Sequence, residues 1–335
     1  MGEQAGWDKY TLIKPLGRGG EGNVYLARDE HLQRYVAVKH VRKPGTERTE
    51  ADRENEDTMG HDTEPENNGS SEEKEERDKE DQDKNVRNQR CHEDEREKIM
   101  REAGYLQQLR HPMLPAVYDL CGDGHGGWYL VMEYIQGWTL RAYIEKNGYV
   151  QEKQARVWGG QLADVLEHLH TRKPPVIYSD LKPDNIMVCP DGELRLIDFG
   201  AAVIRSFGTD RNWSMAVTPG YGAPEQTGVL QRQQTGQGRT DVRLYADERS
   251  DIYALGMILY YMVTGADPAS PPYTALPVYE YQPLLGDSME AIIRKCIRQE
   301  PEARYQTAGE VQKDLGRYAG TGCHMRRKSF ILRNK

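Results

Sequence analysis

The sequence predicts an α+β protein of two lobes, in which a small antiparallel β-rich lobe with one helix precedes a larger, mainly helical lobe. Three observations support this fold class. Residues 10–39 and 114–134 contain short runs of alternating apolar and polar side chains between glycine-rich or charged turns, the pattern of half-buried strands. After Gly137, apolar residues recur at helical spacing in long stretches. The intervening segment 46–95 is too polar to join a core.

The composition of residues 46–95 differs sharply from that of the rest of the chain. The segment holds 20 Asp or Glu and 8 Lys or Arg, and its apolar residues are Ala51, Met59, Val86 and Cys91. The 335-residue chain has a formal net charge of −8, so the −12 of this segment leaves the remainder mildly basic at +4. We therefore expect a disordered acidic insert in a chain long enough for one large domain or two ordinary ones.

Several function classes are disfavoured by composition. No run approaches the roughly 18 apolar residues that a membrane span requires. The N-terminus lacks the charged start and apolar stretch of a secretory signal. The five cysteines are scattered and include no C-x-x-C pair, so we expect reduced thiols rather than a zinc or redox site. The sequence predicts a soluble, cytoplasmic protein.

The small lobe combines strands with one helix. Alternating patterns predict strands within an antiparallel meander at 10–39 and at 114–120 and 128–134. A helix is expected at 99–109, where apolar residues recur at helical spacing, and His111-Pro112 closes it.

The large lobe contains five expected helices, at 140–146, 151–170, 250–264, 289–298 and 307–318. Two short hydrophobic pieces, 186–188 and 194–197, flank a Pro190-Asp191-Gly192 turn and predict a hairpin. The segment 227–243 is rich in Gln, Gly and Thr, and we interpret it as a polar loop insertion.

A glycine-rich stretch and a lysine form the first candidate site. Gly17–Val24 matches G-x-G-x-x-G-x-V, although three glycines in eight residues also make an ordinary hairpin turn. Fifteen residues beyond Val24, Lys39 ends the hydrophobic run Val36–Lys39, where its amine would reach phosphate oxygens covered by the glycine backbone. A buried ammonium needs a partner. The predicted helix carries Glu102, although a helix glutamate is a solvated residue in most proteins.

Further motifs follow in the large lobe. They are Tyr178-Ser179-Asp180-Leu181-Lys182-Pro183-Asp184-Asn185, Asp198-Phe199-Gly200, Ala223-Pro224-Glu225, Asp251 and Arg304. In this order and spacing, with the glycine stretch, Lys39 and Glu102, the chain resembles the protein kinase family over about residues 10–318. The resemblance implies a bilobal protein-kinase-like fold with a small lobe at 10–135, which contains the acidic insert, and a large lobe at 136–318, followed by a basic tail at 319–335.

The resemblance also implies residue roles. Asp180 would be the catalytic base, with Lys39, Glu102, Lys182 and Thr218 as its catalytic partners. The metal ligands for Mg²⁺, or for Mn²⁺ in its place, would be Asn185 and Asp198. Asp251 would anchor the catalytic loop, and Arg304 would pair with Glu225. ATP would lie between the lobes against Leu16, Gly17, Arg18, Gly19, Gly20, Glu21, Gly22, Asn23, Val24, Ala37, Lys39, Met132, Glu133, Ile135 and Met187.

The subtype resembles bacterial serine/threonine kinases of the eukaryotic (Hanks) type. Lys182, two residues after Asp180, and Thr218 resemble the serine/threonine branch. The stretches 247–256 and 304–310 resemble bacterial kinases of the eukaryotic type. The family usually has His-Arg-Asp where this chain has Tyr178-Ser179-Asp180, so the arginine that pairs with a phosphorylated activation loop is absent. The expected partners are Ser or Thr residues of proteins, including Ser206, Thr209 or Ser214 of the chain itself; nucleic acid is not expected.

Two other readings share the fold. A pseudokinase used as a scaffold usually lacks the lysine, the catalytic aspartate or the metal aspartate, and this chain keeps all three. Small-molecule kinases of the aminoglycoside or choline type typically lack Ala-Pro-Glu, Thr218 and the Arg304 partner, which are present here. The basic tail fits either a membrane-surface patch or, preferably, a solvated terminus.

Overall fold

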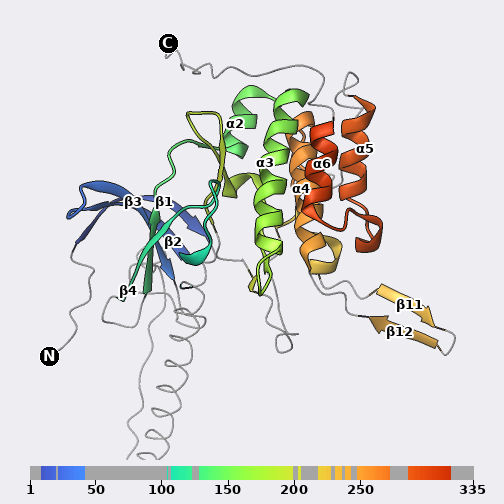
Figure 1. Ribbon diagram of the computed structural model, residues 1–335, viewed down its shortest axis with the longest axis horizontal. Helices are drawn as coiled ribbons and strands as arrows, with labels where there is room; N and C mark the ends of the chain where they lie inside the picture. Colours follow the sequence, from blue (N-terminus) through green and yellow to red (C-terminus); the bar gives the residue numbers. More distant parts are fainter. Residues whose placement is uncertain are drawn as a thin grey trace, which may run out of the picture. The chain divides into compact units, whose positions relative to one another are not determined.

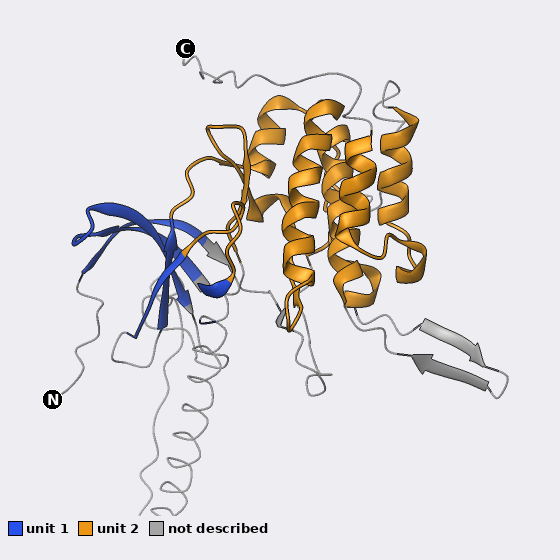
Figure 2. Ribbon diagram, in the orientation of Figure 1, with its two compact units in different colours: residues 1–108, 117–133 blue, residues 109–116, 134–335 orange. Residues whose placement is uncertain are grey.

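The computed structural model describes residues 9–19, 22–41, 104, 107–122, 128–198, 203–204, 218–227, 231–235, 238–242, 247–271 and 286–317. The chain divides into two compact units (Figure 2). Unit 1 comprises residues 1–108 and 117–133, and unit 2 comprises residues 109–116 and 134–335. The acidic insert, the basic tail and most of the helix expected at 99–109 lie outside the described residues.

Unit 1 is built on a five-stranded antiparallel sheet with the order β1-β2-β3-β5-β4 (Figure 1). The strands are β1 (Tyr10–Gly19), β2 (Gly22–Asp29), β3 (Arg34–Val41), β4 (Val117–Gly122) and β5 (Trp128–Glu133). All five overlap the stretches where alternation predicts strands, with β3 and β4 each ending two residues beyond the expected ends. One face of the sheet carries the core cluster of this unit, which consists of Tyr10, Ala27, Val36, Val38, Cys121 and Val131.

Unit 2 is mainly helical. Its long helices are α2 (Leu140–Asn147), α3 (Glu152–His170), α4 (Glu248–Thr264), α5 (Asp287–Cys296) and α6 (Ala308–Arg317). Helix α3 packs against α4 and α6, and α4 packs against α5. The five predicted helices are therefore confirmed, with ends within two residues of the expected ones.

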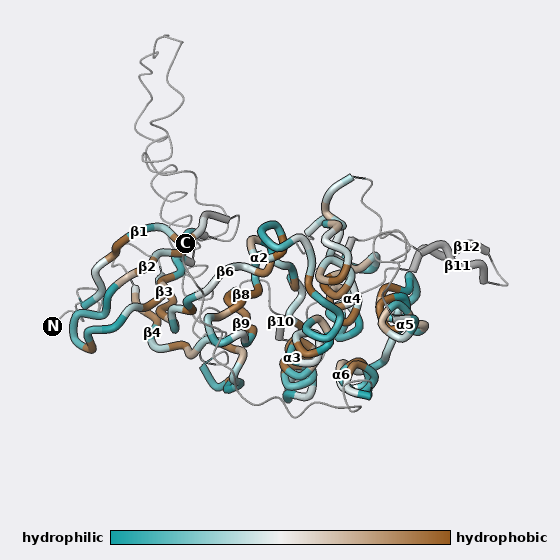
Figure 3. Tube along the Cα trace, turned by 90° about the horizontal axis from the view of Figure 1, so that it is seen from above, coloured by the Kyte–Doolittle hydropathy of each residue, from teal (hydrophilic) through white to brown (hydrophobic). Residues whose placement is uncertain are grey.

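Helix α4 is the central element of unit 2. Its sequence is mostly apolar after the polar first turn, as the hydropathy colouring in Figure 3 allows the reader to follow. Thirteen of its residues are buried. A capping box starts the helix: the side chain of Asp247 accepts a hydrogen bond from Arg249 N, and Ser250 Oγ accepts one from Asp247 N. Gly265 ends it in the left-handed conformation, with φ of 70°. The buried helix thus gives the surrounding loops a fixed support.

Short strands carry the loops of unit 2. A three-stranded sheet has the order β6-β8-β9, with β6 (Trp138–Thr139), β8 (Ile186–Val188) and β9 (Leu194–Leu196), so the predicted hairpin is confirmed. Strand β7 (Val176–Ile177) pairs with β10 (Val203–Ile204). The segment expected as a polar loop at 227–243 contains an antiparallel hairpin of β11 (Gln231–Thr235) and β12 (Gly238–Val242).

The fold class is confirmed, because a β-sheet unit and a helical unit make up an α+β protein. None of the helices in the described part of the chain combines the length and the apolar composition that a membrane crossing requires.

Candidate active site

The sheet of unit 1 brings together several residues expected to contact ATP. Val24 pairs with Lys39 across β2 and β3, and Ala37 pairs with Met132 across β3 and β5. Cross-strand partners lie on the same face of a sheet, and alternate residues of β3 lie on opposite faces. These four side chains therefore share the face opposite the core cluster.

The glycine stretch forms the hairpin next to Lys39. Gly17 pairs with Val24, and Gly19 pairs with Gly22. Two positions at the tip, 20 and 21, lie outside the described residues, as does Glu102. The expected ion pair between Lys39 and Glu102 therefore stays a prediction. Lys39 itself is buried, with 7% of its surface exposed.

The remaining predicted ATP contacts are distributed over both units. Leu16 is exposed and lies at a register irregularity between β1 and β2. In unit 1, Glu133 pairs with Val36 at the end of β5. In unit 2, Ile135 is buried and Met187 pairs with Thr139. Of Arg18, only the backbone pairing, with Asn23, is described.

The Asp180 carboxylate is held on both of its oxygens. Thr218 Oγ1 donates to Oδ1 at 2.6 Å, and Lys182 Nζ lies 2.5 Å from Oδ2. Lys182 Nζ also lies 3.4 Å from Thr218 Oγ1. Asn185 Nδ2 donates to the backbone oxygen of Asp180 at 3.0 Å and to Oδ2 at 3.2 Å. The expected contacts of Thr218 with Asp180 and Lys182 are present, and they fix the direction in which the carboxylate points.

The two expected metal ligands lie at the same end of the β8–β9 hairpin. Asn185 directly precedes β8, and the backbone N–H of Ile197, next to Asp198, donates to Asn185 O at 3.1 Å. Asn185 uses its amide nitrogen on Asp180, so the amide oxygen is the atom that the expected metal ion would use. Among the described residues, no group of three or more His, Cys, Asp or Glu side chains could hold a metal. Two oxygen donors fit Mg²⁺ that is also bound by substrate phosphates.

Asp251 anchors the loop that carries Asp180, as expected. Its two oxygens accept the backbone N–H groups of Tyr178 at 2.7 Å and Ser179 at 2.8 Å. Ser179 has a left-handed backbone with φ of 70°, which is strained for a residue other than glycine. Gln226 Nε2 supports the same turn by donating to Ser179 O at 2.9 Å. These hydrogen bonds stabilise the backbone turn directly before Asp180.

A histidine completes this anchor. His170, the last residue of α3, lies with Nε2 2.8 Å from Asp251 Oδ2 and is 6% exposed at its side chain. Sequence reasoning missed both His170 and Gln226, because neither stands in a motif whose spacing points to the loop.

Burial, together with the nearby carboxylates of Asp198 and Asp180, raises the pKa of Tyr178, so its phenol stays neutral.

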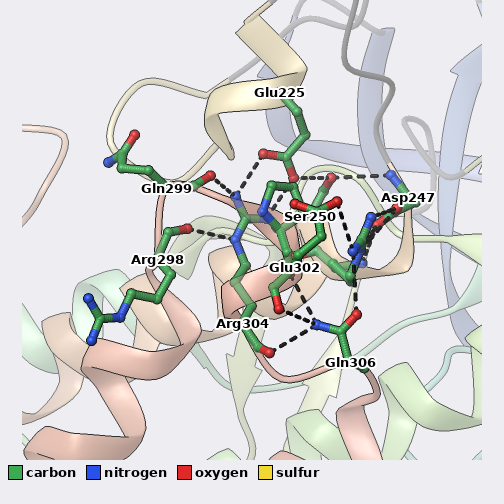
Figure 4. Close-up of polar contacts among 10 residues, drawn as sticks. Glu225, Asp247, Ser250, Arg298, Gln299, Glu302, Arg304 and Gln306 are labelled. Carbon is green, nitrogen blue, oxygen red and sulfur yellow. Dashed lines mark hydrogen bonds and ion pairs between the residues drawn. The ribbon is translucent and has the colours of Figure 1, made fainter. Parts of the chain in front are cut away.

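The expected ion pair between Glu225 and Arg304 is present and buried (Figure 4). Arg304 Nη1 and Nη2 lie 2.6 and 2.8 Å from the two oxygens of Glu225, and the side chains are 0% and 1% exposed. Ser250 Oγ donates to Glu225 at 2.7 Å. The guanidinium also donates to the backbone oxygens of Arg298, Gln299 and Arg249. This pair ties the turn after Thr218 to α4 and to the segment before α6.

Comparisons with known proteins identify the family that this chain resembles. The family described as protein kinase domain matches residues 74–314, a range that begins within the acidic insert and leaves β1, β2 and β3 outside it. Serine/threonine-protein kinase PrkC of Bacillus subtilis is 28% identical over 320 residues, which cover 92% of this chain and 40% of the relative. Serine/threonine-protein kinase PknB of Mycobacterium tuberculosis is 30% identical over 329 residues, which cover 92% and 43%. A probable serine/threonine-protein kinase of Clostridium acetobutylicum is 28% identical with similar coverage. The chain spans about two fifths of the length of these curated relatives.

Proposed function

Since the chain belongs to the protein kinase family, we propose that it is an ATP-dependent serine/threonine protein kinase, which transfers the γ-phosphate of ATP to Ser or Thr hydroxyls of proteins. The observation that carries the proposal is the Asp180 carboxylate, whose two oxygens are held by Thr218 and Lys182. The relatives named above are serine/threonine-protein kinases, which supports the same substrate class.

Asp180 acts as the base in this proposal. Oδ1 accepts from Thr218, so its second lone pair can accept the substrate hydroxyl, while Oδ2 keeps its contacts with Lys182 and Asn185. As the hydroxyl oxygen bonds to the γ-phosphorus, its proton passes to Asp180 and the bond from the γ-phosphorus to the bridging oxygen of ADP breaks. The ammonium of Lys182, beside Asp180, stabilises the negative charge on the transferring phosphoryl group.

In this proposal ATP is bound by the residues of the unit 1 sheet, and its metal ion is bound by Asn185 and Asp198. The glycine hairpin and the face of Val24, Ala37, Lys39 and Met132 would cover adenine and phosphates, which their pairing in one sheet supports. Asn185 and Asp198 would hold Mg²⁺ or Mn²⁺ through oxygen atoms. Bound there, the metal ion would neutralise phosphate charge and orient the γ-phosphate for attack.

The test is phosphate transfer by the purified full chain with radiolabelled ATP, Mg²⁺ and a generic basic protein. We expect labelling on Ser or Thr, and we expect Asp198→Asn and Lys39→Met each to lower the rate below about one hundredth of wild type. The matched control is Asp191→Asn in the β8–β9 turn, where asparagine can keep the contact to Glu193 N.

Three results would contradict the proposal. Wild-type transfer rates in Asp198→Asn or in Lys39→Met would show that the active site is assigned wrongly. Phosphotyrosine as the main product would exclude the serine/threonine class. Nucleotide binding without any transfer by the wild-type chain would favour the pseudokinase reading.

A further inference from the structure

Arg141, the second residue of α2, contacts two carboxylates from separate parts of unit 2. Its Nε atom lies 2.8 and 3.0 Å from the two oxygens of Asp184, and its Nη1 atom lies 2.5 Å from Oδ2 of Asp267. The start of the helix is fixed by Thr139 Oγ1, which accepts a hydrogen bond from Ala142 N at 3.1 Å. A capped helix end therefore presents the guanidinium to both carboxylates.

The first carboxylate belongs to the loop that carries Asp180. Asp184 lies in the short turn Pro183–Asn185. In sequence it lies between Lys182 and Asn185, which are both expected to act in the site. The residue after it, Asn185, donates to Asp180 through Nδ2, and Lys182, two residues before it, contacts Asp180 through Nζ. A shift of Asp184 would therefore move both groups that contact Asp180 Oδ2.

The second carboxylate supports the turn that carries Thr218. Asp267 Oδ1 accepts a hydrogen bond from the Tyr221 hydroxyl at 2.8 Å, and Tyr221 N donates to Thr218 O at 3.2 Å. The turn lies directly on the chain beside Asp267: a Cβ atom added to Gly220, which has φ of 81°, would come within 2.4 Å of the Pro268 backbone. Thr218 in turn donates to Asp180 Oδ1.

These contacts form a closed ring within unit 2. Its members, in order, are Asp180, Thr218, Tyr221, Asp267, Arg141, Asp184 and Asn185. Arg141 links the Asp180 loop, through Asp184, to the Thr218 turn, through Asp267, without contacting Asp180 itself. Although burial opposes it, hydrogen bonding to Asp184 and Asp267 raises the pKa of Arg141, so the link remains charged. The planar guanidinium can bond both carboxylates at once, which an ammonium could not do in the same geometry.

We propose that Arg141 is a positioning residue for phosphate transfer, which holds the Asp180 loop and the Thr218 turn in register so that the Asp180 carboxylate meets the substrate hydroxyl. The inference rests on the proposed kinase function. Removal of Arg141 leaves Asp184 and Asp267 uncompensated and lets the two loops separate. A misplacement of about 1 Å at a reacting group can cost about a hundredfold in rate. The effect should appear in kcat, because none of the residues assigned to ATP is a member of the ring, although Asn185, assigned to the metal ion, is.

The first test compares Arg141→Gln with a matched control, Arg249→Gln. Arg249 is equally exposed, at 22% against 23%, and also bonds two carboxylates, Asp247 and Glu302, which lie outside the ring. We expect Arg141→Gln to lower kcat by about ten- to a hundredfold with the KM for ATP changed less than about threefold. The control should keep the wild-type kcat. Equal loss in both variants, or a rise in KM for ATP without a fall in kcat, would overturn the proposal.

A double-mutant cycle tests whether the ring acts as a unit. Tyr221→Phe removes the bond to Asp267 and opens the ring at another place. If either break releases the two loops, the combined variant should lose little more kcat than Arg141→Gln alone. If the fold-loss in kcat of the double variant equals the product of the two single losses, the two residues act independently. That result would refute the proposal that the ring acts as a unit.

Hydrogen exchange separates this inference from the proposed function. The N–H groups of Asn185, Tyr221 and Gly222 are hydrogen-bonded within the two loops. We expect Arg141→Gln, and not Arg249→Gln, to speed exchange in peptides that cover 179–186 and 218–223. A wild-type chain without transfer activity would refute the proposed function alone, whereas unchanged exchange in Arg141→Gln would refute the role of Arg141 whatever the activity.

Discussion

Replacing Arg304 with methionine should destabilise unit 2 by about 3–5 kcal/mol, because it leaves the Glu225 carboxylate buried without its countercharge. The magnitude follows from the geometry. Glu225 is 1% exposed and Arg304 is 0% exposed at the side chain, so water cannot replace the lost partner. For a unit of this size, such a loss corresponds to a melting temperature lower by about 6–20 °C.

A second variant separates the charge from the packing. The double variant Glu225→Gln with Arg304→Met removes both charges. It therefore has no unpaired buried charge and no desolvation cost for one. We expect the double variant to be more stable than Arg304→Met alone, because paired burial of two charges is close to neutral relative to apolar groups. The exposed pair Arg317 and Asp314 is the control, and Arg317→Gln should cost less than about 1 kcal/mol.

The assay is thermal and urea unfolding of the full chain, followed by circular dichroism at two wavelengths so that unfolding in more than one step is detected. A loss of less than about 1 kcal/mol in Arg304→Met would refute the reasoning, because it would equate a buried pair with an exposed one. A double variant less stable than Arg304→Met would refute the role of the unpaired charge.

Two further predictions concern regions outside the described residues. Replacing residues 46–95 by a short Gly/Ser linker should preserve folding and basal transfer, because four apolar residues in 50 cannot offset the entropy of ordering; circular dichroism and initial rates check this, and an unfolded unit 1 would mean that the segment packs on it. Phosphatase-treated enzyme, autophosphorylated enzyme and a Ser206/Thr209/Ser214 alanine variant should have similar initial rates on an added protein, because Ser179 replaces the arginine that would pair with a loop phosphate. A tenfold drop after dephosphorylation and in the variant would contradict that expectation.

Sequence reasoning was most successful where a local pattern determines the outcome. Alternation and helical spacing depend on neighbouring residues, so the strands of unit 1 and the helices of unit 2 fall where they were expected. The contacts of Thr218 with Asp180 and of Arg304 with Glu225 were expected through family resemblance, since residues 38 and 79 positions apart have no local pattern to link them.

The contacts that sequence reasoning missed join side chains whose flanking sequence contains no motif. Arg141 follows a helix cap and is indistinguishable in sequence from a solvated helix arginine, yet it meets carboxylates 43 and 126 positions away. His170 ends a helix, where a histidine is favourable for the helix dipole alone. The hairpin of β11 and β12 escapes prediction because its sequence is rich in Gln, Gly and Thr and lacks the alternation of apolar and polar residues that indicates a strand.

The loop around Ser179 gives a structural reason to expect activity without a phosphate. An arginine before the catalytic aspartate couples loop order to phosphorylation, because its buried charge needs an anion. Here Ser179 is uncharged and 8% exposed, and its left-handed backbone is stabilised by N–H bonds from two successive residues to Asp251 and by Gln226 on its carbonyl oxygen. All of these contacts come from the body of unit 2, so the direction of Asp180 is set by the fold of that unit.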